Sequence, residues 1–209
     1  MITFTFIALI LLVSTLAFMD KRILGRFIFH PYSIKHNREH HRFLTHAFIH
    51  GDFIHLLFNV LALYSFGLQL EENFFANDYF FDPRIGRVLY ILLFTGGIYA
   101  ASAAIYIQNK NNASYTSLGA SGAISAVVFS YILVKPLSNI IFLFINMRAW
   151  LFGVVMIGIS LWLIELKKRG KFNDNISHEA HLWGALFGIA FTIAVKPQVA
   201  VSFIEKILR

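Results

Sequence analysis

The stretch "SLGASGAISAVVFSYILV", residues 117–134, contains no charged side chain. Roughly 20 consecutive apolar residues span the hydrocarbon core of a bilayer, so a run of this length predicts a membrane helix. Pro136 should end that helix, because proline lacks the N–H that a helix interior requires. Near the start of the run, Ser121 stands in "GASG", and a serine between glycines could serve helix packing or catalysis.

The composition of the whole chain agrees with a membrane protein. Only 14% of its 209 residues are charged and the mean hydropathy is +0.65, whereas a soluble domain carries about 25% charged residues. The absence of cysteine excludes disulfides, thiol nucleophiles and cysteine metal sites. The net charge of +7 comes from basic residues dispersed between apolar segments, which favours anionic lipid headgroups as partners and argues against nucleic acid.

Uncharged runs along the chain predict an all-α integral membrane protein with six transmembrane helices in a single domain, residues 1–209. The expected helices cover about 2–19, 53–70, 88–107, 117–134, 149–164 and 180–195. The first run lacks the basic flank and the cleavage site of a signal peptide. Residues 20–50 mix charges with aromatics, as segments in the headgroup zone do, and we interpret "NIIFLFINMR", residues 139–148, as an interfacial loop.

Six alternating crossings place the beginnings of the second, fourth and sixth helices at the same membrane face. The polar residues within the spans gather at these beginnings: His50, His55 and Asn59, then Ser121, then His178 and His181. Polar groups inside a membrane are costly, so their concentration at one depth predicts a functional site.

Ser121 alone leaves two interpretations open. Gly119, Gly122 and Ala126 could simply allow two helices to approach closely, as small residues do in membranes. The same glycines would leave a nucleophilic hydroxyl unobstructed. A serine at a helix N-terminus also has free backbone N–H groups nearby, and these can stabilise an oxyanion.

His181 could be an interfacial residue bonded to a neighbour, but its position on the helix suggests more. Gly184 and Gly188 follow it at i+3 and i+7, on the same helical stripe. Close packing of this stripe on Gly122 and Ala126 would bring His181 towards Ser121, as a general base requires. No Asp or Glu stands in an obvious orienting position, so we expect a Ser-His dyad rather than a triad.

His55 and Asn59 are four residues apart and project from one helix face. Their side chains are suitable donors to an oxyanion. The histidine-rich segment 40–55 could instead bind a metal, but its imidazoles do not share one face and no paired carboxylate joins them. Structural hydrogen bonding to loop carbonyls is the simpler interpretation of His46 and His50.

Three charged residues are explained without a catalytic role. Arg42 would anchor the first loop to phosphate or to loop carbonyls. Glu71 and Glu72, at the far end of the second helix, are expected to be solvated or to pair with loops.

Together these residues resemble the rhomboid family of intramembrane serine proteases, from about Arg42 to Gly188. The matching motifs are His50, His55 and Asn59 as "HxxxxHxxxN", Gly119 to Gly122 as "GxSG", and Ala180 to Gly188 as "AHxxGxxxG". The resemblance implies Ser121 as nucleophile, His181 as general base and acid, and His55, Asn59 and the Ser121 N–H as oxyanion donors. Gly119, Gly122 and His50 would have supporting roles.

The chain departs from the family pattern at two positions. Rhomboids often carry Trp-Arg in the first loop, where this chain has His41 and Arg42. Some members have an aromatic residue four positions after the nucleophile, stacked on the catalytic imidazole, where this chain has Ser125.

The implied function is hydrolysis of peptide bonds within or near transmembrane segments of membrane-protein substrates, without a cofactor or metal. The resemblance also implies a plasma or inner membrane location with the site opening to the extracytoplasmic side. With the N-terminus inside, seven of the 18 Lys and Arg residues lie inside and eleven outside, so the positive-inside rule favours the opposite orientation. A non-catalytic rhomboid-like chaperone or adaptor and a histidine-rich metal transporter are the alternatives.

Overall fold

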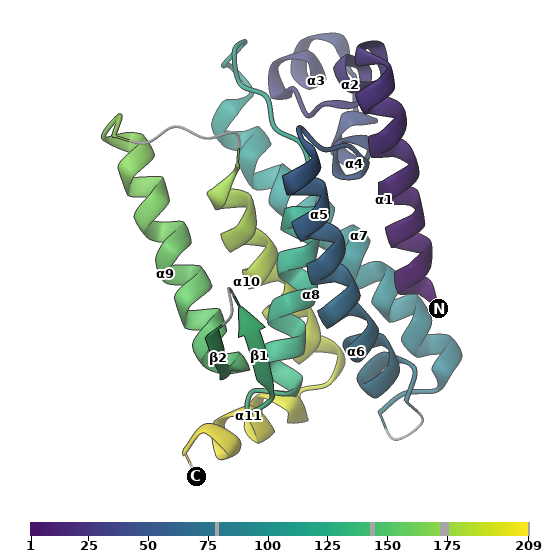
Figure 1. The fold of residues 1–209 in the computed structure, drawn as a ribbon, viewed down its shortest axis with the longest axis vertical. Helices are drawn as coiled ribbons and strands as arrows, with labels where there is room; N and C mark the ends of the chain where they lie inside the picture. Colours follow the sequence, from purple (N-terminus) through teal and green to yellow (C-terminus); the bar gives the residue numbers. More distant parts are fainter. Residues whose placement is uncertain (78–79, 143–144, 172–175, 209) are drawn as a thin grey trace.

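The computed structural model describes residues 1–77, 80–142, 145–171 and 176–208. Long helices run side by side through the bundle (Figure 1): α1 (Ile2–Met19), α7 (Pro83–Asn109), α8 (Ser121–Val134), α9 (Ala149–Lys168) and α10 (His178–Val195). A further helix is continuous from Phe53 to Phe75. It consists of α5 (Phe53–Ala62), α6 (Leu68–Leu70) and two π-helical turns, η2 (Leu63–Gly67) and η3 (Glu71–Phe75).

Shorter elements lie at the two ends of the bundle. At one end the first loop folds into α2 (Lys21–Phe27), α3 (Pro31–Asn37), α4 (Arg42–Thr45) and a 3₁₀ turn, η1 (His46–Phe48). At the other end lie β1 (Asn139–Phe142), β2 (Ile145–Arg148) and α11 (Gln198–Leu208).

Four of the described helices are long and apolar enough to cross a membrane, namely α1, Phe53–Phe75, α7 and α9. Counting α10 and α11, which meet at 112°, as one bent span raises the number to five. α8 has 14 residues and is therefore about 21 Å long, shorter than the roughly 30 Å hydrocarbon core. The predicted all-α membrane bundle is confirmed, whereas six crossings remain a prediction.

α8 forms the centre of the bundle, with every residue from Gly122 to Leu133 buried. It ends at Val134, just before Pro136, as the sequence predicts. A methyl group placed on Gly184 would lie 2.0 Å from the carbonyl oxygen of Gly122, and one on Gly188 would lie 2.2 Å from that of Ala126. α8 and α10 thus touch backbone to backbone along the small-residue stripe, and this predicted packing is confirmed.

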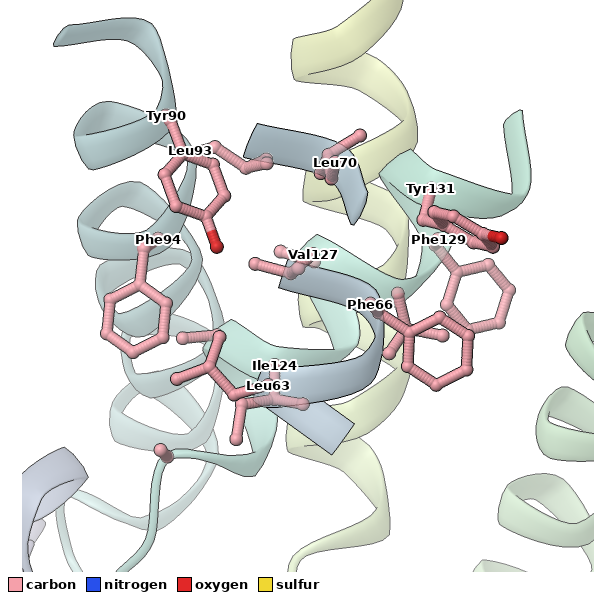
Figure 2. Close-up of a cluster of buried hydrophobic side chains, with 14 of the residues drawn as sticks. Leu63, Phe66, Leu70, Tyr90, Leu93, Phe94, Ile124, Val127, Phe129 and Tyr131 are labelled. Atoms are coloured by element: carbon pink, nitrogen blue, oxygen red, sulfur yellow. The ribbon is translucent and has the colours of Figure 1, made fainter. Parts of the chain in front are cut away.

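Larger apolar side chains fill the other side of α8. Figure 2 shows Ile124 and Val127 of α8 facing side chains of η2, α6 and α7, which include Leu63, Leu70 and Phe94. Deeper along α8 and α10, the hydroxyls of Ser130 and Thr192 are hydrogen-bonded to each other. Because lipid tails are as apolar as these side chains, close packing and such bonds hold membrane helices together.

The predicted solvation or loop pairing of Glu71 is wrong, because its side chain is buried against α1. Its carboxylate accepts hydrogen bonds from the backbone N–H groups of Ile2 (2.7 Å) and Thr3 (2.8 Å) and from the Thr3 hydroxyl (2.7 Å). A carboxylate at a helix N-terminus satisfies unpaired N–H groups and complements the helix dipole. Glu71 therefore joins the end of the second long helix to the start of the first.

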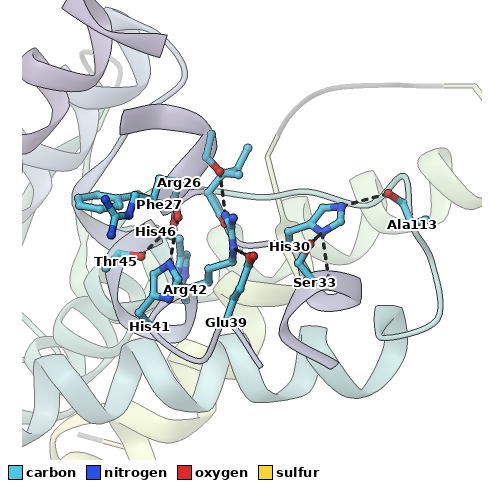
Figure 3. Close-up of polar contacts among 12 residues, drawn as sticks. Arg26, Phe27, His30, Ser33, Glu39, His41, Arg42, Thr45, His46 and Ala113 are labelled. Carbon is cyan, nitrogen blue, oxygen red and sulfur yellow. Dashed lines mark hydrogen bonds and ion pairs between the residues drawn. The ribbon is translucent and has the colours of Figure 1, made fainter. Parts of the chain in front are cut away.

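Hydrogen bonds of Arg42 and its neighbours stabilise the conformation of the first loop (Figure 3). The buried Arg42 guanidinium donates to the carbonyl oxygens of Gly25 (2.9 Å) and Ile28 (2.7 Å) and forms an ion pair with Glu39. His41 Nε2 donates to the carbonyl oxygen of Arg26 at 3.2 Å. Of the two predicted anchors for Arg42, the loop carbonyls are the ones found, and His41 adds a further tie.

The predicted interfacial loop at residues 139–148 contains an antiparallel pair of strands, with Asn139 opposite Arg148. The isoleucine side chains of Ile141 and Ile145 are exposed. After α10, Pro197 interrupts the helix and α11 turns sharply away. The hairpin and α11 therefore cover the end of the bundle opposite the first loop (Figure 1).

Candidate active site

The beginnings of α5, α8 and α10 lie at the end of the bundle that carries the first loop (Figure 1). Contacts between backbones and side chains bring them together. A methyl group on Gly119, just before α8, would lie 2.7 Å from Cε1 of His55 in α5. One on Gly122 would lie 3.5 Å from the carbonyl oxygen of Ala180 in α10.

Ser121 is the first residue of α8, and the segment before it is fixed on the first loop. Ser117 and Phe29 exchange two backbone hydrogen bonds, of 2.9 and 3.1 Å, and the Gly119 N–H donates to the carbonyl oxygen of His46 at 2.9 Å. Gly119 has a φ of +106°, which L side chains rarely adopt. Glycine is required here both by this conformation and by the His55 ring packed against it.

The half-buried Ser121 lines a cavity of about 20 Å³. Polar residues from the first loop, α7 and the start of α10 share its wall, including His46, Ser102 and Ser177. A space of this size accommodates about one water molecule. The expected nucleophile therefore borders a small cavity whose wall combines these polar groups with apolar side chains.

His181 lies in the first turn of α10, where Ser177 caps the helix by accepting a hydrogen bond from the Ala180 N–H at 3.4 Å. Its imidazole is half-buried, with Nε2 shielded from solvent, and it borders a second pocket lined by Phe129 of α8 and Ser160 of α9. Within the described residues, no hydrogen bond joins the Ser121 hydroxyl to this imidazole. Catalytic hydrogen bonds are often long in free enzymes and tighten only in the substrate complex.

His55 and Asn59 line the adjacent face of α5. The Asp52 side chain caps this helix by accepting from the His55 backbone N–H at 2.8 Å. The Asn59 side chain is buried and donates one amide hydrogen to the His55 carbonyl oxygen, 2.8 Å away. An amide nitrogen carries two hydrogens, so the second can serve another acceptor.

The predicted bond to a loop carbonyl is found for His46, whereas His50 contacts a hydroxyl of α1 instead. His46 Nδ1 donates to the carbonyl oxygen of Arg42 at 2.8 Å, and His50 Nδ1 lies 2.9 Å from the hydroxyl of Ser14. Burial lowers the pKa of His46 to about 4 and that of His50 to about 3. Both imidazoles are therefore neutral at physiological pH.

In the described part of the chain, no three side chains of His, Cys, Asp or Glu gather so as to hold a metal ion. The position where some rhomboids carry a stacking aromatic, Ser125, is buried in the α8 packing.

Sequence reasoning missed Ser14, a hydroxyl in the first apolar run. Its one signal in the sequence is a small polar residue within an apolar run. Thr5 and Thr15 give the same signal, so the sequence does not single out Ser14.

Comparisons with known proteins agree with this architecture. A family model described as "Rhomboid domain" matches residues 37–198. The chain is 30% identical over 152 residues to the RHOMBOID-like protein 12, mitochondrial, of Arabidopsis thaliana, covering 69% of this chain and 43% of the relative. It is 30% identical over 190 residues to the Rhomboid-related protein 1 of Caenorhabditis elegans, covering 88% and 47%.

A bacterial relative is also similar. The Bacillus subtilis (strain 168) protein named "Putative rhomboid protease YdcA" is 26% identical over 153 residues, covering 73% of this chain and 65% of the relative. The chain spans about half the length of the plant and nematode relatives. On the family match and these similarities, the chain belongs to the rhomboid family and is an integral membrane protein.

Proposed function

We propose that the chain is an intramembrane serine endopeptidase that cleaves membrane proteins within or near their transmembrane segments. The observation that carries the proposal is the convergence of three helix beginnings. Gly119 brings His55 to the start of α8, and Gly122 and Gly184 bring the start of α10 to the same place. Membership of the rhomboid family, with a relative named as a protease, supports the same function.

In the proposed reaction, the Ser121 hydroxyl attacks the scissile carbonyl while His181 accepts its proton. His181 then returns this proton to the leaving amine. His55, Asn59 and the Ser121 backbone N–H donate to the tetrahedral oxyanion. A water molecule then hydrolyses the acyl-enzyme, and the cavity beside Ser121 has room for one.

The substrate must unwind locally before this attack. Carbonyl groups in a transmembrane helix are hydrogen-bonded to the N–H four residues later, which hides them from a nucleophile. The proposed substrates are therefore transmembrane proteins with a helix-destabilised segment near the active-site face.

Labelling with a fluorophosphonate probe, combined with cleavage of a transmembrane reporter, tests the assignment. Wild type should be labelled and should cleave, whereas Ser121→Ala and His181→Ala should lose cleavage and Ser121→Ala should lose labelling. Undiminished cleavage by either variant contradicts the dyad. A folded wild type that is neither labelled nor active would instead be the non-catalytic adaptor, and chelator-sensitive transport that survives Ser121→Ala would indicate a metal transporter.

We place the site at the extracytoplasmic face of a plasma or inner membrane. Because the chain has no cysteine, single cysteines can be introduced at positions in the 20–40 and 72–86 loops without background. Labelling of the 20–40 cysteine from outside intact cells supports this orientation. Labelling of the 72–86 cysteine from outside reverses it.

A further inference from the structure

Ser14 is a buried hydroxyl in α1 that the proposed chemistry does not use. Its side chain is fully buried at the contact with the first loop, whereas the neighbouring Thr15 is exposed. The Ser14 hydroxyl lies 3.0 Å from the carbonyl oxygen of Phe48 and 2.9 Å from Nδ1 of His50.

Counting hydrogens in these two contacts fixes the state of His50. A carbonyl oxygen only accepts, so the single hydroxyl hydrogen of Ser14 goes to Phe48. The Ser14 oxygen must then accept from His50, so Nδ1 of His50 bears the ring hydrogen. Because burial keeps His50 neutral, its Nε2 carries a lone pair instead of a second hydrogen.

The His50 ring lies beside Gly119 and His55, at the proposed oxyanion site. Nε2 of His50 is buried and has no hydrogen-bond partner among the described residues. Cδ2, the ring carbon bonded to Nε2, lies 3.7 Å from the point where a methyl group on Gly119 would stand, and Nε2 of His55 lies 3.1 Å from that point. The His50 and His55 rings are 5.0 Å apart, nearly edge to face.

We propose that Ser14 is a positioning residue that acts through His50 on the oxyanion donor His55. The two rings are 5.0 Å apart and both Nε2 atoms are buried without a partner among the described residues, so a lone pair on His50 Nε2 disfavours a second lone pair on His55 Nε2. It therefore favours the His55 tautomer with hydrogen on Nε2. This nitrogen packs against Gly119, which precedes Ser121 by two residues. A neutral imidazole can donate only from the nitrogen that bears hydrogen, so Ser14 keeps His55 competent as a donor. The inference rests on the proposed oxyanion role of His55.

Nitrogen-15 NMR of histidine-labelled protein in detergent micelles reads the tautomers directly, without any activity. Signals are assigned with His50→Gln and His55→Gln. In wild type and in the control Thr15→Val, we expect hydrogen on Nδ1 of His50 and on Nε2 of His55. In Ser14→Val and Ser14→Ala, the His50 hydrogen should move to Nε2. Hydrogen on Nε2 of His50 in the wild type, or an unchanged pattern in Ser14→Ala, overturns the proposal.

Kinetics on the transmembrane reporter provide the second measurement. Ser14→Val should lower kcat by about tenfold with little change in KM, less than the roughly hundredfold cost of removing an oxyanion donor. Ser14→Thr retains the hydroxyl and should restore kcat, and Thr15→Val should match wild type. Equal losses in folded Ser14→Thr and Ser14→Val would assign the effect to packing and reject the role of the hydroxyl. An inactive, unlabelled wild type would reject the proposed function, and the tautomer measurement would still stand on its own.

Discussion

The carbonyl oxygen of Gly122 lies 2.0 Å from the point at which a β-carbon would stand on Gly184. No side chain separates α8 from α10 there, so the two backbones determine the spacing of the helices. Ser121 immediately precedes Gly122, and His181 lies three residues before Gly184. The spacing at this contact therefore controls how close the proposed nucleophile and base can come.

Gly184→Ala should destabilise the protein and abolish most reporter cleavage, because a backbone carbonyl cannot yield as a flexible side chain can. Overpacking of this kind costs about 1–3 kcal/mol, measurable as a lower midpoint of thermal unfolding in detergent. Gly158→Ala is the matched control, since nothing lies within 4 Å of a methyl group at this helical position. A Gly184→Ala protein with the stability and activity of wild type would contradict the observed helix spacing.

Gly119→Ala should slow reporter cleavage strongly, while the protein still folds. The added methyl group would lie 2.7 Å from Cε1 of His55, and φ of +106° strains any L side chain; such backbone strain costs of order 1–3 kcal/mol. The His55 ring must move, so probe labelling and reporter cleavage should both slow. Gly51→Ala meets only Leu118 at 3.7 Å and should behave as wild type. Equal activities of the two variants would argue against a functional position for His55.

Much of the fold could be predicted because its signals are local. The uncharged runs gave the long helices, Pro136 gave the end of α8, and the spacing of Gly184 and Gly188 gave the face of α10 that packs on α8. Each of these depends on residues within a few turns of one another. The gathering of polar residues at three helix beginnings followed from the same local patterns and from the alternation of crossings.

Other features could not be predicted, because their partners are distant in the chain or depend on side-chain detail. Glu71 binds Thr3, 68 residues away, and Ser14 binds His50, 36 residues away. Nothing near Glu71 or Ser14 in the sequence identifies these partners. The strand pairing within residues 139–148 was expected to be a loop. The sequence did not predict the strands, because apolar residues in a membrane protein carry no clear alternating pattern. The glycine pattern predicts that the starts of α8 and α10 pack together, but the proposed hydrogen bond between Ser121 and His181 depends on side-chain rotamers that the sequence does not specify.

Glu71→Gln should destabilise the protein, because a neutral amide replaces the carboxylate at the start of α1. The Ile2 N–H, the Thr3 N–H and the Thr3 hydroxyl all donate to this carboxylate, and the amide NH₂ group cannot accept from them. Loss of buried hydrogen bonds to a charged group costs about 1.5–3 kcal/mol. Glu72→Gln, at the exposed adjacent position, should leave the unfolding midpoint within error of wild type. Similar midpoints for the two variants would show that the Glu71 carboxylate contributes little.

Stability should fall as the pH decreases from about 6.5, the ordinary pKa of histidine in an unfolded chain. Burial lowers the pKa of His46 to about 4 and that of His50 to about 3 in the folded protein. Between these values the unfolded chain binds protons that the folded chain does not, so acid favours unfolding. Each histidine should contribute a slope of about 1.4 kcal/mol per pH unit.

Reversible unfolding in detergent at pH 8, 7, 6 and 5 measures this slope. The free energy of unfolding should be nearly constant between pH 8 and 7, where both histidines are neutral in either state, and should fall between pH 6 and 5. His46→Asn removes one of the two groups and should make the acid slope shallower by about half, whatever its effect on stability at pH 8. A wild-type stability that does not change down to pH 5 would mean that these imidazoles accept protons within the folded protein.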